Sequence, residues 1–299
     1  MKDIFSQKII AETACGHNGD IKILKKLINI AKECRVKTIK IQMFDVKERA
    51  IPGTKEWSIF SKLGLSDTNW KTAINFAKKK KLNIIADVYG EKSFSLALKN
   101  NVDAFKVHSE DFFNTYFITK VLEANKPVLI STGGTHRSEL FDLVTWLKKK
   151  NKLNKNIYLV PGIQTFPTPI QAHHLSEITD LKKKYSKFGI KIAYADHISG
   201  DELSSEVFPF MALSAGAEFV EKHYTDSRKL KRIDYHSALD QRQLKNFMIN
   251  NIPSGIGQSG TCDVGILRYQ SYNRNKYPKP QFKWPNPYED IEKIRNKND

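Results

Sequence analysis

Nine residues with reactive or ligand-forming side chains lie at or near the ends of short apolar segments that are far apart in the chain. They are Glu12, Lys40, Gln42, Lys106, Ser109, Ser131, Asp196, His197 and His223. Imidazoles bind divalent metal ions, ammonium groups bind carboxylates and phosphates, and a carboxylate can transfer protons. Random placement would scatter these residue types along the segments. Their common position therefore indicates an enzyme.

The apolar segments have the length of buried strands, and stretches with helical periodicity separate them. They cover residues 8–12, 38–42, 82–87, 103–109, 127–132, 157–162, 190–197 and 218–223. Helices are expected over residues 20–35, 66–81, 91–100, 114–125, 136–151, 171–187, 200–215 and 237–250. Active sites of (β/α)8 barrels lie at the carboxyl ends of the strands. We therefore expect an α/β protein with the (β/α)8, or TIM barrel, fold.

The composition divides the chain into two parts. Residues 1–251 contain all the expected units, and a chain of 299 residues is long enough for one barrel of typically ~250 residues and a tail. Residues 252–299 are rich in proline and aromatic residues and predict a short irregular C-terminal extension. Residues 43–65 are longer than a usual strand–helix connection, so we expect a loop that partly covers the top of the barrel.

Net charge and cysteine content limit the possible binding partners and the cellular compartment of the protein. The formal charge is +17, which would suit a protein that binds nucleic acid or an anionic substrate. The runs of lysine at the ends of expected helices offer another explanation, because they complement the negative ends of the helix dipoles. A nucleic-acid binder is the least favoured interpretation, because the sequence has no basic patch interleaved with aromatic residues. It also has no run of ~18 apolar residues and no signal-peptide pattern. With three widely spaced cysteines, we expect a cytoplasmic protein that does not contact a membrane.

Two histidines could form a metal site. His197 ends the seventh apolar segment and His223 the eighth. Because neighbouring strands lie ~4.8 Å apart, the two imidazoles can converge on one ion and leave positions for water and substrate. The alternative is that each His forms hydrogen bonds within the barrel top, and spacing alone does not decide. Mn²⁺ would suit mixed imidazole, carboxylate and water ligands.

Two lysines and a hydroxyl-rich turn could bind an anion. Lys40 and Lys106 lie within strands, where an unpaired ammonium is costly, so each should meet a carboxylate, a phosphate or a carbonyl. Ser131-Thr132-Gly133-Gly134 could cradle a phosphate with hydroxyl and backbone N–H groups. It could also be an ordinary strand-to-helix turn. Considered alone, this tetrapeptide is better explained as a turn. Considered together with Lys40 and Lys106, it is better explained as part of a phosphate site.

Three further residues have two interpretations each. Glu12 could act as an acid or base or bind a hydroxyl, and it could also form an ion pair with Lys40 across adjacent strands. Asp234 could bind sugar hydroxyls or cap the last helix. His17, in the first loop, could serve the site, but solvent exposure is the expectation for a lone loop histidine.

Taken in chain order, these motifs resemble the sialic acid synthase family, which includes N-acetylneuraminate synthase and its pseudaminic, legionaminic and spore-coat relatives. The motifs are Ala11-Glu12, His17-Asn18-Gly19-Asp20, Lys40-Ile41-Gln42, Lys106-Val107-His108-Ser109, Ser131-Thr132-Gly133, Phe166-Pro167-Thr168-Pro169, Asp196-His197 and Glu221-Lys222-His223, with Asp234 and Ser237 after them. Each is weak alone, but the set in register is specific for the family and less so for its substrate. The resemblance covers residues 9–250.

The resemblance implies a reaction, a cofactor and partners. The family condenses phosphoenolpyruvate with the open-chain aldehyde of an N-acylated hexose, which gives a 2-keto-3-deoxy sugar acid and phosphate, a transferase reaction of EC 2.5.1 type. It implies His197 and His223 as ligands of a divalent metal, with Mn²⁺ favoured and Mg²⁺ or Co²⁺ as alternatives. It also implies a homodimer.

The resemblance also assigns roles to the remaining residues. Lys40, Lys106, Ser109 and Ser131 are implied contacts of phosphoenolpyruvate, Thr132 is a further expected substrate contact, and Glu12 is implied as the carboxylate that manages protons. Gln42 and Asp234 are implied as polar contacts near the substrates, and Gln164 and Phe166 line the implied sugar side.

The sequence departs from the family pattern on both sides of the implied site: the change at 195 removes one phosphate or carboxylate donor, and the changes at 162, 164 and 166 line the sugar side. Ala195 replaces the usual Ser, Gly162 a Cys, Gln164 an Asn-like residue and Phe166 a Tyr. We also expect the C-terminal antifreeze-like domain to be lacking, which in the family supplies an arginine to the N-acyl group in the partner's site. The anion and metal side is therefore expected to be largely retained, with an altered or unidentified acceptor.

Two other functions stay open at this level. One is a catalytically altered or inactive family member that acts in surface-polysaccharide biosynthesis. The other is a different metal-dependent barrel lyase or aldolase. The sequence does not identify the acceptor sugar, the product stereochemistry or the oligomeric state.

Overall fold

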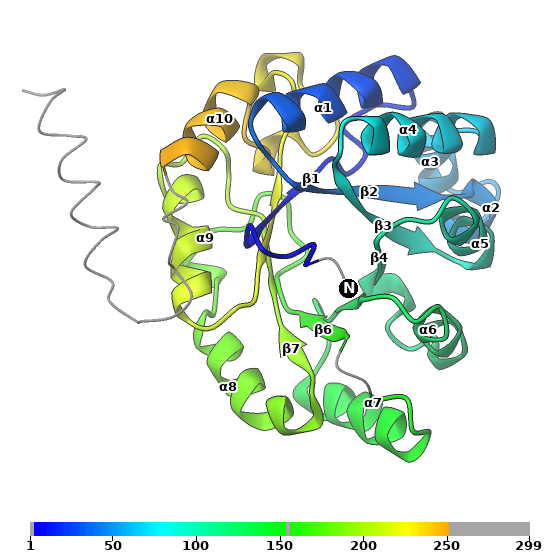
Figure 1. The fold of residues 1–299 in the computed structure, drawn as a ribbon, viewed down its shortest axis with the longest axis vertical. Coiled ribbons are helices and arrows are strands. Elements are labelled where there is room, and N and C mark those ends of the chain that lie inside the picture. The colour runs from blue at the N-terminus through cyan, green and yellow to red at the C-terminus, as the bar shows by residue number, and fades with distance from the viewer. Residues whose placement is uncertain (1–2, 154–155, 251–299) are drawn as a thin grey trace, which may run out of the picture. The chain divides into compact units, whose positions relative to one another are not determined.

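The protein is seen in a computed structural model that describes residues 3–153 and 156–250 (Figure 1). In this part of the chain, parallel strand segments form one sheet in the order β7-β6-β5-β4-β3-β2-β1-β9-β8. The segments are β1 Ile9–Glu12, β2 Thr38–Phe44, β3 Asn83–Tyr89, β4 Ala104–Val107, β5 Val128–Ser131, β6 Ile157–Val160, β7 Lys191–Ile192, β8 Tyr194–Asp196 and β9 Val220–His223.

The short segments β7 and β8 act as one strand that closes the sheet into a barrel. The backbone N–H of Ala193 donates to Leu159 O at 2.9 Å on the β6 side. On the other side, the N–H of Tyr194 donates to Phe219 O, next to β9, at 3.1 Å. The pair therefore corresponds to the expected strand at 190–197. The predicted TIM barrel is confirmed.

Helices surround the strands (Figure 1). They are α1 Ile21–Glu33, α2 Val46–Arg49, α3 Lys55–Leu63, α4 Asp67–Lys79, α5 Glu91–Lys99, α6 Thr115–Leu122, α7 Arg137–Lys149, α8 Ser176–Tyr185, α9 Ser204–Ser214 and α10 Gln241–Asn250. Side chains cap two of the helices, because Asp20 accepts a hydrogen bond from Lys22 N and Ser66 accepts one from Asn69 N. No helix among the described residues is long and apolar enough to cross a membrane.

The prediction of a loop over residues 43–65 is wrong. Strand β2 continues to Phe44, and the segment then forms α2 and α3. Asp45 caps α2 by accepting a hydrogen bond from Lys47 N at 2.9 Å, and Thr54 caps α3 by accepting from Trp57 N at 3.1 Å. Helices this short depend on tertiary packing rather than on their own periodicity, so the pattern alone did not reveal them.

The barrel interior is layered because alternate strand residues point inward. At the amino-terminal end of the strands, the Phe5 ring stacks on Phe219, with centroids 4.4 Å apart, and lies 4.7 Å from Tyr158. A buried apolar layer follows, with Ile85 and Leu129 among its members. The next inward positions, toward the carboxyl ends, are charged. The predicted C-terminal extension at 252–299 lies outside the described residues.

Candidate functional site

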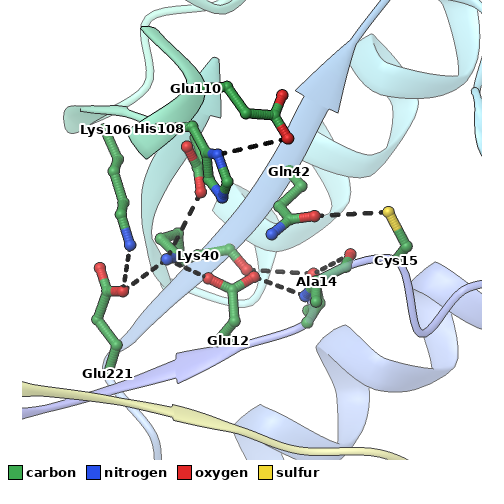
Figure 2. A network of polar contacts seen from close by, with 11 residues as sticks. Glu12, Ala14, Cys15, Lys40, Gln42, Lys106, His108, Glu110 and Glu221 are labelled. Carbon is green, nitrogen blue, oxygen red and sulfur yellow. Dashed lines mark hydrogen bonds and ion pairs between the residues drawn. The ribbon is translucent and has the colours of Figure 1, made fainter. Parts of the chain in front are cut away.

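Two lysines and two glutamates form a buried ion network at the centre of the barrel (Figure 2). Lys40 Nζ lies 2.6 Å from Glu12 Oε2 and 2.7 Å from Glu221 Oε2. Lys106 Nζ lies 2.6 Å from the same Glu221 oxygen, and Asp87 Oδ2 is 3.7 Å from Lys40 Nζ. All five residues are buried. The structure thus brings Glu12, Lys40 and Lys106 together as predicted.

The pKa values of the network residues shift in different directions. Burial alone would raise the pKa of the Glu221 carboxyl, but Lys106 and Lys40 overcome this effect and lower the pKa to about 2. Burial, reinforced by repulsion from Lys106, lowers the pKa of Lys40 to about 8. Burial raises the pKa of Asp87. Glu221 is therefore ionised at neutral pH, and Lys40 can exchange a proton near neutral pH.

Sequence reasoning missed Glu221 and Asp87 as site residues. Glu221 stands two positions before His223, so strand alternation places both side chains inward. By the same parity, Asp87 shares an inward face with Ile85 on β3. The alternative that Glu12 pairs with Lys40 is confirmed, since the two residues are register partners on β1 and β2. Glu12 Oε1 also accepts a hydrogen bond from Ala14 N at 2.6 Å.

His197 and His223 lie together, with their ring centroids 5.1 Å apart. His197 Nδ1 is 2.8 Å from the carbonyl oxygen of Ile163, and the Ser237 hydroxyl donates to His197 O at 2.9 Å. The Phe166 ring packs 4.5 Å from the His197 ring and 6.1 Å from that of His223. The buried Nδ1 of His223 has no hydrogen-bond partner among the described residues.

These two imidazoles could hold a metal ion. A carbonyl can only accept, so the Ile163 contact places a proton on His197 Nδ1 and leaves the Nε2 lone pair available. Burial lowers the pKa of His197 to about 3 and that of His223 well below its usual value, so both rings are neutral. Within the described residues, no cluster of three or more His, Cys, Asp or Glu side chains could hold a metal. Water and substrate would complete such a site.

Asp196 points away from this site. Its carboxylate pairs with Lys222 Nζ at 2.9 Å and accepts a hydrogen bond from Ile198 N at 2.8 Å. Both partners of the pair are fully buried. Because alternate residues face opposite sides of a strand, Asp196 faces outward while His197 faces the barrel. The Asp196–Lys222 pair therefore supports the strand ends rather than the chemistry.

The predicted phosphate turn lies at the end of β5. Ser131 and Thr132 are buried, and Ser131 Oγ has no hydrogen-bond partner among the described residues. A Cβ at Gly133 would lie 2.8 Å from Gln164 Nε2, so this turn approaches the predicted sugar-side residue closely. Ser109 begins a short 3₁₀ turn, Ser109–Asp111, which His108 separates from β4. Ser109 therefore follows β4, the strand that carries Lys106, while Ser131 and Thr132 lie at the end of the neighbouring strand β5.

Gln42 lies toward the carboxyl end of β2, and Asp234 lies in the connection that follows β9. Gln42 Oε1 lies 3.5 Å from Cys15 Sγ (Figure 2). Burial raises the pKa of Asp234 above its usual value, and a backbone hydrogen bond from Cys15 offsets only part of this rise. Asp234 does not cap the last helix, so that alternative is wrong. Asp240 does so instead, by accepting a hydrogen bond from Gln243 N at 2.8 Å.

The expectation of an exposed His17 is wrong. Its side chain is fully buried, with 0% exposed. The ring lies edge-on to Trp70 at a centroid distance of 5.7 Å, and Nδ1 accepts a hydrogen bond from Gly19 N at 3.1 Å. The first loop folds back beneath α4, which a local sequence pattern does not reveal.

Two of the sequence departures touch each other. A Cβ at Gly162 would lie 2.6 Å from Ala195 O and 3.0 Å from Ala195 Cβ. Ala195 itself is buried in the barrel interior. The close approach requires a small residue at 162, so the replacements at 162 and 195 form one local change in the barrel wall.

Comparison with known proteins identifies relatives along most of the chain. The model of the NeuB family matches residues 27–258. An uncharacterized protein of Methanocaldococcus jannaschii is 32% identical over 82% of this chain and 69% of its own length. The N,N'-diacetyllegionaminic acid synthase of Campylobacter jejuni is 27% identical over 79% of this chain and 73% of its own.

Solved structures share the fold. The N-acetylneuraminic acid synthetase of Leptospira borgpetersenii aligns with a TM-score of 0.72 at 23% identity, over 97% of this chain and 91% of that one. A truncated 3-deoxy-D-arabino-heptulosonate 7-phosphate synthase of Thermotoga maritima aligns with a TM-score of 0.61 at 18% identity, over 81% of this chain and 83% of that one. At these identities the likeness concerns the barrel architecture.

Proposed function

This chain belongs to the NeuB family, and we propose on that premise that it joins phosphoenolpyruvate to a sugar aldehyde with release of phosphate. The observation that carries the proposal is the buried pair Lys40 and Lys106, which share one oxygen of Glu221. Two ammonium groups at the centre of a barrel, with the hydroxyl of Ser131, unpartnered among the described residues, at the end of β5, are suited to a small substrate with several negative charges.

The lysine side of the site would bind phosphoenolpyruvate. Lys40 and Lys106 would donate to its carboxylate or phosphate, and the hydroxyls of Ser109, Ser131 and Thr132 would complete the set of donors. Such preformed donors stabilise charge as it develops on a departing phosphate, because they need no reorganisation. The unpartnered, buried Ser131 Oγ is available for this contact.

The histidine side would receive the aldehyde. A divalent ion held by His197 and His223, Mn²⁺ by preference or else Mg²⁺ or Co²⁺, would supply Lewis-acid polarisation of the aldehyde oxygen when bound. Gln42, Gln164, Phe166 and Asp234 would orient the sugar. C3 of phosphoenolpyruvate would then bond to the aldehyde carbon, water would add at C2, and the C2–O bond to phosphate would break.

Glu12 and Lys40 would manage the proton of that water. Their charged atoms are 2.6 Å apart, and burial lowers the pKa of Lys40 to about 8. An ammonium of this kind can give up and regain a proton near neutral pH. The pair therefore offers an acid and a base at one position beside the bound anion.

Isotope tracing tests the proposal. Phosphoenolpyruvate labelled with ¹⁸O at the bridging oxygen is incubated with the protein, Mn²⁺ and a panel of N-acylated hexoses. C–O cleavage predicts that the label appears in the released phosphate, which mass spectrometry detects. Label retained in the organic product would instead indicate a lyase or aldolase reaction, and no phosphate release with any sugar would contradict a condensing enzyme.

Replacing Ala195 with Ser should strengthen the binding of phosphoenolpyruvate. The new hydroxyl would face the barrel interior and donate to an anion, and a hydrogen bond to a charged group contributes roughly 1.5–3 kcal/mol. We expect the KM for phosphoenolpyruvate to fall about tenfold, which corresponds to ~1.4 kcal/mol. The matched control is Ala193→Ser, one layer deeper in the same apolar cluster, which should not lower KM. An equal effect of both substitutions would contradict an anion site beside Ala195.

A further inference from the structure

Arg49 is enclosed by aromatic rings at the carboxyl end of β2 and β3. Its guanidinium carbon lies 3.8 Å from the centroid of the Phe60 ring, 3.9 Å from that of Tyr89 and 4.8 Å from that of Phe44. We call these three residues the Arg49 cage. The arginine side chain is only 8% exposed, although it comes from the last residue of the short helix α2.

The cage leaves two of the three guanidinium nitrogens without a hydrogen bond within the described part of the chain. Arg49 Nε and Nη1 are buried and have no acceptor among the described residues. In the same part of the chain, the one carboxylate within ion-pair distance is Glu110, whose Oε1 lies 4.0 Å from Nη2. The neighbouring Cys15 thiol does not neutralise the charge, because burial raises its pKa to about 12. Aromatic faces attract the cation but accept no strong hydrogen bond.

The guanidinium stands near Gln42 and Asp234, two of the residues that the proposed function assigns to the sugar. The Tyr89 ring that covers it also packs against His108 at a centroid distance of 4.8 Å, and His108 directly follows β4. Cys15, whose thiol feels the Arg49 charge, contacts Gln42. The same positive charge opposes the rise in pKa that burial imposes on Asp234 and Glu110. Buried donors in this setting point to a ligand that supplies oxygen acceptors.

We propose that Arg49 anchors an oxygen-bearing substituent of the aldehyde substrate, remote from the aldehyde carbon. The substituent presents either an amide carbonyl, as on an N-acylated sugar, or an anionic oxygen, as on a sugar phosphate. Both chemistries satisfy the unpartnered N–H groups, and an anionic oxygen also neutralises the buried charge. The inference rests on the proposed function, since it names a contact of its second substrate. Because α2 carries Arg49 and α3 carries Phe60 of the cage, the segment 46–63 would set acceptor specificity.

Substitutions at Arg49 separate substrate binding from packing. Arg49→Met keeps an apolar side chain between the rings but removes every donor, and Arg49→Lys keeps the charge without the planar fork. The control Phe60→Leu loosens the cage and leaves the guanidinium intact. A second control, Arg137→Met, removes a 72% exposed arginine on α7. Thermal unfolding of all four variants identifies any that fails to fold.

Calorimetric titration in the presence of phosphoenolpyruvate and Mn²⁺ measures binding of N-acetylmannosamine, its 6-phosphate and mannose. We expect wild type to bind at least one of the first two and mannose more weakly. Arg49→Met should weaken that binding 30-fold or more while it leaves phosphoenolpyruvate affinity within twofold of wild type. Arg49→Lys should retain more binding of the phosphate than of the neutral amide, and both controls should bind within threefold of wild type.

The outcomes distinguish the inference from the reaction on which it rests. Equal binding of the acylated or phosphorylated sugar by wild type and Arg49→Met overturns the anchor, as does wild type that binds none of the three sugars. If Phe60→Leu weakens binding as much as Arg49→Met, the cage acts through packing and the anchor is also overturned. Intact, Arg49-dependent sugar binding without phosphate release keeps the anchor and contradicts the proposed reaction alone.

Discussion

Replacing Glu221 with Gln is expected to destabilise the protein by about 3 kcal/mol or more, since removal of one partner from a buried ion pair typically costs 3–5 kcal/mol. Lys106 loses the one carboxylate that lies within 4.0 Å of it among the described residues. Lys40 keeps Glu12 at 2.6 Å and Asp87 at 3.7 Å, which places the estimate at the lower end of the range. Urea unfolding followed by circular dichroism measures the change.

A surface pair provides the matched control. Glu123→Gln breaks the ion pair between Glu123 and Lys152, whose oxygen and nitrogen are 2.8 Å apart, but the Glu123 side chain is 59% exposed. Pairs of this kind contribute ~0–1 kcal/mol. Adding Lys106→Met to the Glu221→Gln variant should restore part of the lost stability, because the uncompensated ammonium is removed. Similar small effects of Glu221→Gln and Glu123→Gln would show that the network does not hold buried charges.

The largest loss of activity is expected from His223→Ala. If His197 and His223 hold the proposed divalent ion, removal of one of only two protein ligands should abolish tight metal binding. Lewis-acid polarisation is worth several kcal/mol, and a loss of ~4 kcal/mol corresponds to a turnover about 10³-fold lower. Electron paramagnetic resonance of Mn²⁺ measures binding, and phosphate release measures turnover.

Another histidine shows whether these losses are specific. His174 is exposed, so His174→Ala should bind Mn²⁺ and release phosphate as wild type does. His197→Ala should reproduce the losses of His223→Ala, because the two rings lie 5.1 Å apart. Wild-type Mn²⁺ affinity in both His197→Ala and His223→Ala would exclude this pair as the metal site.

The barrel and the direction of its reactive side chains could be read from the sequence. A strand alternates its faces with a period of two, so the pattern of residues 38–42 already places Lys40 and Gln42 on the face opposite Ile39 and Ile41. Parallel strands in a barrel present their carboxyl ends on one side. The local pattern and this general rule were therefore enough to predict that Lys106, His197 and His223 lie at the same end of the barrel.

Pairing partners and short covering elements could not be read in this way. Glu221 binds Lys40 across 181 positions of the chain, and the contact exists only because barrel closure sets β9 beside β1. The burial of His17 and the Arg49 cage likewise depend on packing of α4 or α3 against the barrel.

Local periodicity thus determined which face of each strand carries chemistry. The tertiary structure decided which charges meet, since a Coulomb interaction depends on separation in space, and closure of the barrel sets that separation.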